Sequence, residues 1–248
     1  MRPNILAHRG ASTLAPENTR PSFQMAINLG ADGVEFDVQM TKDNQLVVIH
    51  DECLERTTRV KGYVKDFTLK EIKKLDAGKY FSRQYKDERI LTLDETLDIV
   101  KSCKIINIEL KNGLIEYEKI EEKVIKTIQA WKLTEKTIIS SFNHYSINKI
   151  KKIDGNIMTG ILYFAQLYNP WNYALEVKAD AVHPYYPGVK REVIEKCHQK
   201  GIKVNVFAVN EEKDILNMLQ QGADAIITDH LERARGIAGN YLKRKNSK

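Results

Sequence analysis

Long apolar runs are missing from this chain of 248 residues. No stretch approaches the ~20 apolar residues that a membrane-spanning helix needs. Residues 1–4 lead directly into a predicted strand at residues 5–8, which leaves no room for a charged and then apolar export signal. We therefore expect a soluble globular protein of the cytoplasm with no stable membrane anchor.

Cysteine is scarce, and a glycine-rich phosphate loop is lacking. Cys53, Cys103 and Cys197 are odd in number and far apart, which disfavours both a disulfide framework and a zinc site. We expect reduced, mostly buried thiols. No glycine-rich loop follows the first predicted strand, which disfavours an open, doubly wound nucleotide-binding sheet.

Charge of one sign is only mildly in excess, at +6. A positive balance is compatible with binding to nucleic acid or to an anionic membrane. The lysines, however, are spread along predicted helices, and the one dense basic run, at residues 243–248, is typical of a solvated tail. We expect no nucleic-acid partner and a small anionic substrate, while the oligomeric state stays open.

Residues 33–51 carry the densest group of chemically useful side chains. Apolar and polar residues alternate at the start of this stretch, which predicts a strand with Glu35 and Asp37 on one face. Charged residues usually face water, so an exposed amphipathic ribbon is the alternative interpretation. The remaining chain decides between the two.

A polar turn at residues 41–45 follows this strand. It is too short for the crossover helix of a parallel connection, so the next strand, residues 46–50, should return antiparallel. With a two-residue loop at residues 43–44, counting outward places Asp37 opposite His50. Directly opposed residues share a face of the hairpin, so a carboxylate and an imidazole would meet there.

Eight main strands are predicted, and helical patterns follow most of them. The strands begin near residues 5, 34, 105, 137, 158, 181, 203 and 225. Strand and helix alternation with short links indicates a parallel sheet, and eight units indicate an α/β fold of the TIM barrel type, (β/α)8. The residue 46–50 strand would be an extra hairpin arm after the second strand, and residues 1–248 would form one domain.

Residues 52–91 break this alternation. The stretch is loop-like, and a capping box at residues 68–71 opens a short helix. No segment in it alternates as a core strand would. We therefore predict a small inserted subdomain that lies over one end of the barrel.

Polar side chains end the first three barrel strands, and the carboxyl ends of barrel strands usually carry the active groups. Three of these side chains are carboxylates, from Glu35, Asp37 and Glu109. At about 4 Å apart they would repel by roughly 4 kcal/mol per pair at an effective dielectric near 20. A divalent cation removes this repulsion, and an all-oxygen ligand set favours Mg²⁺ or Ca²⁺ over Zn²⁺.

Two cations and two imidazoles surround the predicted metal ligands. Arg9 can bridge two phosphate oxygens and Lys111 can add a point charge, so a phosphodiester suits the site. His8 and His50 could remove a proton from the attacking oxygen and give one to the leaving oxygen. The residues do not decide which histidine has which role, although we favour His50 as the base.

Eight short motifs together carry a resemblance to a known family. They are His8-Arg9-Gly10, Pro16-Glu17-Asn18-Thr19, Glu35-Phe36-Asp37, Thr41-Lys42-Asp43, His50-Asp51, Leu54-Glu55-Arg56-Thr57-Thr58, Glu109-Leu110-Lys111 and Ile227-Thr228-Asp229. In this combination the chain resembles the glycerophosphodiester phosphodiesterases nearly from end to end.

The resemblance implies a barrel with an inserted subdomain over its mouth and a divalent cation, Mg²⁺ or Ca²⁺, held by Glu35, Asp37 and Glu109. It also implies acid and base roles for His8 and His50. The implied reaction releases an alcohol from a glycerophosphodiester and yields glycerol 3-phosphate. Attack by the glycerol 2-hydroxyl would form a cyclic phosphate, which water then opens.

Two further residues are candidates for substrate binding. Phe207 stands where many members of the family carry Trp; it can press a flat face on the glycerol but lacks the indole donor. A plain core aromatic is the alternative for Phe207. Glu17 either orients Arg9 or a histidine, or belongs to the turn that starts the first helix.

Two rival functions remain. A phospholipase acting on larger lipid diesters would need an apolar rim, for which the aromatics of residues 67–85 are candidates: Phe67, Tyr80, Phe81 and Tyr85. A catalytically silent barrel that binds phosphorylated metabolites is the other. The presence of both histidines and all three carboxylates disfavours the silent barrel.

Overall fold

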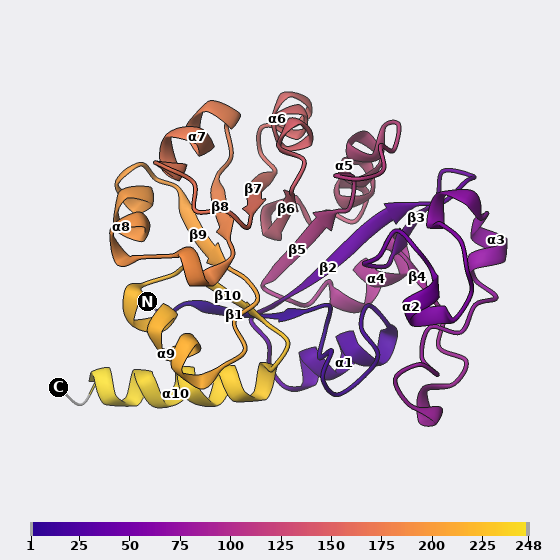
Figure 1. Ribbon diagram of the computed structural model, residues 1–248, viewed down its shortest axis with the longest axis horizontal. Coiled ribbons are helices and arrows are strands. Elements are labelled where there is room, and N and C mark those ends of the chain that lie inside the picture. The colour runs from indigo at the N-terminus through magenta and orange to yellow at the C-terminus, as the bar shows by residue number, and fades with distance from the viewer. Residues whose placement is uncertain (1, 247–248) are drawn as a thin grey trace.

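Eight parallel strands close into a barrel in the computed structural model, which describes residues 2–246 (Figure 1). In spatial order they are β1 (Asn4–His8), β2 (Gly33–Met40), β5 (Ile105–Leu110), β6 (Thr137–Ser141), β7 (Met158–Tyr163), β8 (Ala181–Pro184), β9 (Lys203–Val206) and β10 (Ala225–Thr228). Strand β1 pairs with both β2 and β10, which closes the ring. The predicted TIM barrel is confirmed.

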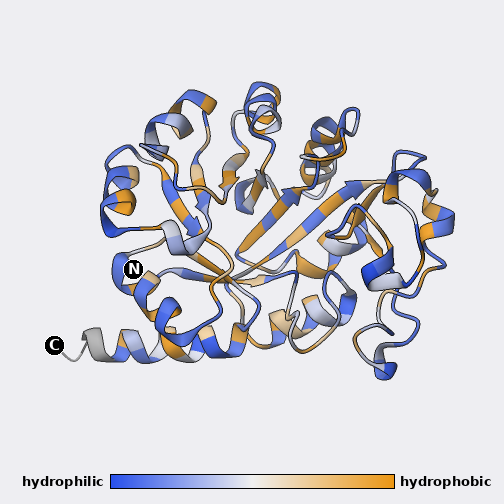
Figure 2. Ribbon diagram, viewed as in Figure 1, coloured by the Kyte–Doolittle hydropathy of each residue, from blue (hydrophilic) through white to orange (hydrophobic). Residues whose placement is uncertain are grey.

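The helices surround this barrel (Figure 1). They are α1 (Arg20–Asn28), α4 (Leu93–Val100), α5 (Ile120–Ala130), α6 (His144–Ile153), α7 (Pro170–Val177), α8 (Arg191–Gln199), α9 (Glu212–Gln221) and α10 (Leu231–Asn246). Each of α5 and α6 shows the alternation of apolar and polar residues visible in Figure 2. On α5, Ile120, Val124 and Ile128 are fully buried, and each contributes about 1.5–3 kcal/mol by leaving water.

Strand β3 (Leu46–Val48) returns antiparallel to β2, as the hairpin pattern predicts, but in a different register. The ladder places Asp37 opposite Ile49, whose backbone N–H donates to the Asp37 carbonyl at 3.0 Å. The predicted opposition of Asp37 and His50 is wrong by one residue. His50 instead lies just beyond the end of β3.

The register differs because the hairpin loop has three residues and not two. The backbone N–H of Thr41 donates to the carbonyl of Gln45 at 2.9 Å. Between them Asn44 adopts the left-handed conformation, with φ at 60°, which asparagine tolerates better than most residues. One extra loop residue shifts every pair in the ladder by one.

Residues 52–91 form short elements and one small hydrophobic cluster. The elements are α2 (Glu55–Thr58), η1 (Val64–Asp66), α3 (Leu69–Ile72), η2 (Arg83–Tyr85) and the two-residue strand β4 (Leu91–Thr92). The buried cluster contains Leu54, Val64 and Ile72, packed against Val47 and Ile49 of the hairpin. Strand β4 pairs antiparallel with β3, a pairing that no alternation in the sequence indicated.

Three aspartates fasten the amino ends of the barrel strands. Asp32, Asp180 and Asp224 each stand just before a strand, in three similar Ala-Asp turns. Each carboxylate accepts the backbone N–H of a residue in the preceding barrel strand at 2.7–2.8 Å. Each also meets a basic side chain, from Arg2, Lys151 and His198 respectively.

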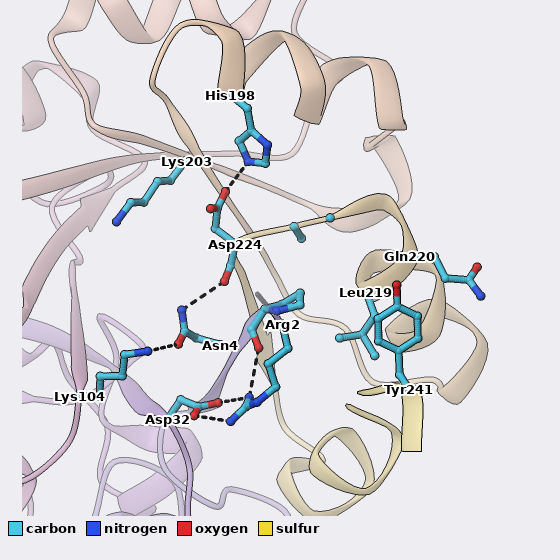
Figure 3. Close-up of a pocket in the computed structure, with 13 residues that line it drawn as sticks. Arg2, Asn4, Asp32, Lys104, His198, Lys203, Leu219, Gln220, Asp224 and Tyr241 are labelled. Carbon is cyan, nitrogen blue, oxygen red and sulfur yellow. Dashed lines mark hydrogen bonds and ion pairs between the residues drawn. The ribbon is translucent and has the colours of Figure 1, made fainter. Parts of the chain in front are cut away.

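Two of these aspartates line a cavity of about 590 Å³ at the amino-terminal end of the barrel (Figure 3). Arg2 points at Asp32, and His198 points at Asp224. None of the predicted catalytic or metal-binding residues lines this cavity. This end of the barrel therefore holds strands in place, and the predicted chemistry lies at the other end.

Replacing Asp32 with asparagine should lower the free energy of unfolding by about 1–2 kcal/mol at pH 7, since charged hydrogen bonds to Arg2 and Ile5 weaken. Burial alone would raise the pKa of Asp32, but the bonds from Arg2 and Ile5 lower it below 3.8. This charge therefore stabilises the fold fully above pH 3.8 and less as the pH falls further.

Denaturant unfolding of both proteins between pH 7 and pH 3 checks this prediction. The difference in unfolding free energy between the two proteins should shrink as the pH falls below the ordinary pKa of aspartate, 3.8. An equal difference at every pH would contradict a role for the charge. Asp98→Asn, at an exposed carboxylate on α4, serves as the control.

Three other expectations concern the chain as a whole. Among residues 2–246, no helix combines the length and the apolarity needed to cross a bilayer. Cys103 and Cys197 are buried and Cys53 is exposed, and all three thiols are free. Most of the basic run at residues 243–248 lies outside the residues whose side chains are described.

Candidate active site

Three acidic side chains meet at the carboxyl ends of β2 and β5. The parallel register pairs Asp37 with Glu109, and Glu35 lies two residues earlier on the same face of β2. One carboxylate oxygen from each residue lies within 4.8 Å of the other two. All three side chains are buried, and Glu35 Oε1 and Asp37 Oδ1 have no hydrogen-bond partner among the described residues.

The three carboxyl groups differ in their affinity for protons. Burial, together with the charge of Asp37, raises the pKa of Glu35 to about 8. Burial and the same charge also raise the pKa of Glu109. Burial would raise the pKa of Asp37 as well, but the charge of Arg9 leads the effects that lower it below its usual value. This crowding, with two orphaned oxygens, fits a hard divalent cation.

His8 ends β1 and lies beside the carboxylates. Its Nδ1 is 2.6 Å from Asp229 Oδ1, and its Nε2 is 3.8 Å from Glu35 Oε2. Burial lowers the pKa of His8, but the Asp229 hydrogen bond and the charge of Glu35 outweigh it and raise the pKa above 6.5. Asn210 donates to Asp229 at 2.6 Å, so the orienting carboxylate is itself held.

His50 has the same arrangement on the other side. Its Nδ1 is 2.6 Å from Asp51 Oδ1, and its Nε2 is 3.2 Å from the Nζ of Lys111. Lys111 also donates to Glu109 at 2.8 Å, which links His50 to the acidic cluster. In both histidines an aspartate holds Nδ1 and leaves Nε2 toward the cluster.

The orienting aspartates are residues to which sequence reasoning gave no role. Asp51 directly follows His50, and Asp229 ends the last quoted motif, Ile227-Thr228-Asp229. Their presence in these motifs was the one sequence signal that could have indicated a role for Asp51 and Asp229 at the site. Asn210 directly precedes Glu211, the cap residue of α9, and its side-chain amide donates to Asp229.

Arg9 and Glu17 form a pair at the mouth of the barrel. Arg9 adopts the left-handed conformation, with φ at 58°, and its guanidinium donates to Glu17 at 2.9 Å. The Arg9 Nε lies 3.5 Å from Asp37 Oδ2. Of the alternatives for Glu17, the contacts favour orientation of Arg9, and no described hydrogen bond joins Glu17 to a histidine.

Arg56 of the inserted segment connects the two sides of the site. Its guanidinium donates to both Glu17 oxygens at 2.7 Å and to Asp51 Oδ2 at 2.5 Å. Burial would raise the pKa of Asp51, but its hydrogen bonds with Arg56 and His50 outweigh burial and lower this pKa to about 2. A single side chain therefore holds the partners of both Arg9 and His50.

Aromatic rings occupy the other half of the mouth. Phe142, Phe164, Tyr185 and Phe207 follow β6, β7, β8 and β9, and the ring centroids of their contacting pairs are 4.9–6.1 Å apart. We call these four residues the aromatic arc. Phe207 is partly buried and packs against the Leu6 cluster of the barrel interior. Polar groups thus come from β10, β1, β2 and β5, and rings from the four remaining strands.

A family model and several known proteins match this chain over most of its length. The model of the glycerophosphoryl diester phosphodiesterase family matches residues 8–233. A glycerophosphodiester phosphodiesterase of Caldanaerobacter subterraneus is 46% identical over 233 residues, which cover 94% of this chain and 96% of that protein. One of Bacillus altitudinis is 42% identical, covering 93% of this chain and 96% of that protein.

A solved structure of an Oleispira antarctica phosphodiesterase, in complex with the product sn-glycerol-3-phosphate, superposes with a TM-score of 0.86. It is 28% identical and covers 96% of this chain, which in turn covers 97% of it. The likeness therefore extends to the whole barrel and is not limited to the site.

Proposed function

The chain belongs to the glycerophosphoryl diester phosphodiesterase family and hydrolyses glycerophosphodiesters, and from this premise we propose how its residues do so. We propose Glu35, Asp37 and Glu109 as the ligands of a Mg²⁺ or Ca²⁺ ion. The buried, crowded oxygens support this assignment. When bound, such an ion would neutralise the carboxylates and polarise a phosphate oxygen.

Arg9 and Lys111 are proposed to hold the phosphate. Their cationic groups contact Glu17 and Glu109 respectively, which fixes both at the mouth. An arginine can donate to two phosphate oxygens and a lysine adds a point charge. Phe207 is proposed to lie against the glycerol, as the nearest ring of the aromatic arc to β10 in strand order.

His50 and His8 are proposed as general base and general acid. His50 Nε2 would take the proton of the glycerol 2-hydroxyl as that oxygen attacks the phosphorus, and His8 would protonate the departing alcohol oxygen. A cyclic phosphate and a free alcohol result. Water then opens the cyclic phosphate to glycerol 3-phosphate, with the two histidines in exchanged roles.

The observation that carries this proposal is the pair of histidine–aspartate contacts on either side of the carboxylates. Each aspartate fixes its imidazole with Nδ1 as donor, which leaves Nε2 to exchange protons. A silent phosphate-binding barrel would have no need to orient two imidazoles in this way.

Residues 52–91 are proposed to cover the mouth as an inserted subdomain. Arg56 binds Glu17, and the Glu17 backbone N–H donates to the Tyr80 hydroxyl at 3.2 Å. Tyr80 therefore serves the site wall and not an apolar rim. Phe67 packs into the subdomain's own cluster, so these two aromatics offer little to a lipid.

Product analysis tests the proposed function. With glycerophosphocholine and Mg²⁺ or Ca²⁺, we expect equal amounts of choline and glycerol 3-phosphate. Release of phosphocholine and glycerol would place the cleaved bond on the other side of the phosphorus and contradict the proposal. Binding of the diester without any product would support the silent barrel.

Replacing Arg56 with alanine should lower kcat by about 10- to 100-fold, since groups that orient active residues typically have effects of this size. Arg56→Lys should restore only part of the rate, because one ammonium cannot make the four described bonds to Glu17 and Asp51. Steady-state kinetics of the three proteins give the result.

Lys65→Ala is the matched control for Arg56. Lys65 lies on the same inserted segment, is exposed and contacts only Asp66 and the ring of Tyr63 among the described residues. It should keep the rate of the unmodified protein. Full recovery of kcat in Arg56→Lys, or an equal loss in Lys65→Ala, would reduce Arg56 to a general stabilising role.

A further inference from the structure

The aromatic arc is more exposed than a core needs. Phe164 is 65% exposed and Tyr185 is 40% exposed, although each ring contacts the other and Phe207. Large apolar side chains left in water at one site commonly mark a surface that binds an apolar group. The arc also continues into the polar half of the mouth, because β9 adjoins β10 and β6 adjoins β5.

Further apolar side chains lie beyond the arc at the same end of the barrel. Tyr168 in the loop after β7 is 92% exposed, and Tyr145 in the first turn of α6 is 88% exposed. Leu114, in the loop after β5, is 84% exposed. This end of the barrel therefore exposes more apolar side chains than a glycerol or a small head group requires.

We propose that the aromatic arc binds the acyl chain of a monoacylated glycerophosphodiester. This inference rests on the proposed function, in which Phe207 lies against the glycerol. An acyl group on the glycerol 1-oxygen would leave the polar half of the mouth and cross Phe207 onto Phe164 and Tyr185. A hydrocarbon chain forms no hydrogen bonds, and Phe164, Tyr185 and Phe207 contact one another through their rings. Such a surface suits an apolar chain.

The chemistry limits the substrate to one acyl chain. The 2-hydroxyl oxygen forms the new bond to phosphorus, so a second acyl group on that oxygen would remove the nucleophile. The bond from phosphorus to the head-group oxygen breaks, and the alcohol leaves with a proton. Water then opens the ring, so that one water is consumed and an acylglycerol phosphate remains.

The test compares two substrates in each protein. They are glycerophosphocholine and a short-chain lysophosphatidylcholine that stays monomeric, and released choline is measured for both. In Phe164→Ser, the ratio of kcat/KM for the acylated over the plain substrate should fall about tenfold, the scale of removing one buried aromatic contact. Tyr185→Ser should change the ratio in the same direction.

Ile153→Ser is the matched control. Ile153 is an exposed apolar residue at the carboxyl end of α6, away from the mouth. The kcat/KM ratio of Ile153→Ser for the acylated over the plain substrate should equal that of the unmodified protein. An unchanged ratio in both arc variants, or no cleavage of the acylated substrate, would overturn the inference.

Two outcomes separate this inference from its premise. If the unmodified protein fails on glycerophosphocholine itself, the proposed function fails first. If it cleaves that diester and sediments with phosphatidylcholine vesicles, while the ratio stays the same in Phe164→Ser, the arc docks on a membrane and does not bind the chain of a substrate. That result would also overturn the inference.

Discussion

Replacing His8 or His50 with alanine should each lower kcat by on the order of 10³, because each imidazole is assigned one of two proton transfers and such transfers contribute about 10²–10⁴-fold. Neither histidine is a proposed metal ligand. The affinity for Mg²⁺ or Ca²⁺ should therefore survive within a few-fold, and calorimetric titration measures it alongside the rate.

Two further variants accompany the histidine substitutions, one at an orienting aspartate and one at a histidine far from the site. Exchange of Asp51 for asparagine should resemble a mild form of His50→Ala, since it removes the charge that fixes Nδ1. His198→Ala, at the opposite end of the barrel, should keep kcat. Substantial turnover in both His8→Ala and His50→Ala would remove the acid and base assignment.

Removal of divalent ions is the second large effect. Treatment with EDTA should lower the rate by at least about a thousandfold, because a bound cation supplies several kcal/mol of charge stabilisation at the phosphate. Added Mg²⁺ or Ca²⁺ should restore it. Asp37→Asn, which keeps the shape but removes one charge, should need a far higher metal concentration for the same rate.

Asp98→Asn again serves as the control, since that exposed carboxylate contacts only Lys101 among the described charged groups. Its metal dependence should match that of the unmodified chain. A full rate in EDTA, with no tightly bound ion found by elemental analysis, would show that the three carboxylates have another purpose.

The barrel was predictable because its signals are local. Each strand is a short apolar run bounded by turn residues, and the polar residue at its end marks the mouth. Glu35, Asp37 and Glu109 meet because two parallel strands place their ends side by side. Topology alone therefore brings together residues 72 positions apart, as the pairing of Asp37 with Glu109 shows.

The hairpin register was not predictable from the same signals. The choice between a two-residue and a three-residue loop depends on whether Asn44 adopts a positive φ, and the local sequence allows both. His50 nevertheless reaches the site, because Asp51 and Lys111 hold its ring from both sides. His50 therefore lies near the carboxylates, although the predicted pairing of His50 with Asp37 is wrong.

Side-chain contacts between distant segments were the least predictable part. In the sequence, Arg56 is a cation in a loop-like stretch. Only the fold shows that it binds Glu17 and Asp51. The rings of the aromatic arc stand singly after four strands, so no periodic pattern indicates that they touch. Such contacts are fixed by tertiary packing and leave no repeat in the sequence.

The central claim is that Glu35, Asp37 and Glu109 share one divalent cation between the two imidazoles. Anomalous diffraction from crystals grown with Mn²⁺ tests it most directly. We predict one strong peak within about 2.0–2.6 Å of an oxygen from each carboxylate, the usual range for hard cations. A peak at any other group of side chains, with these three carboxylates left without metal, would contradict the account.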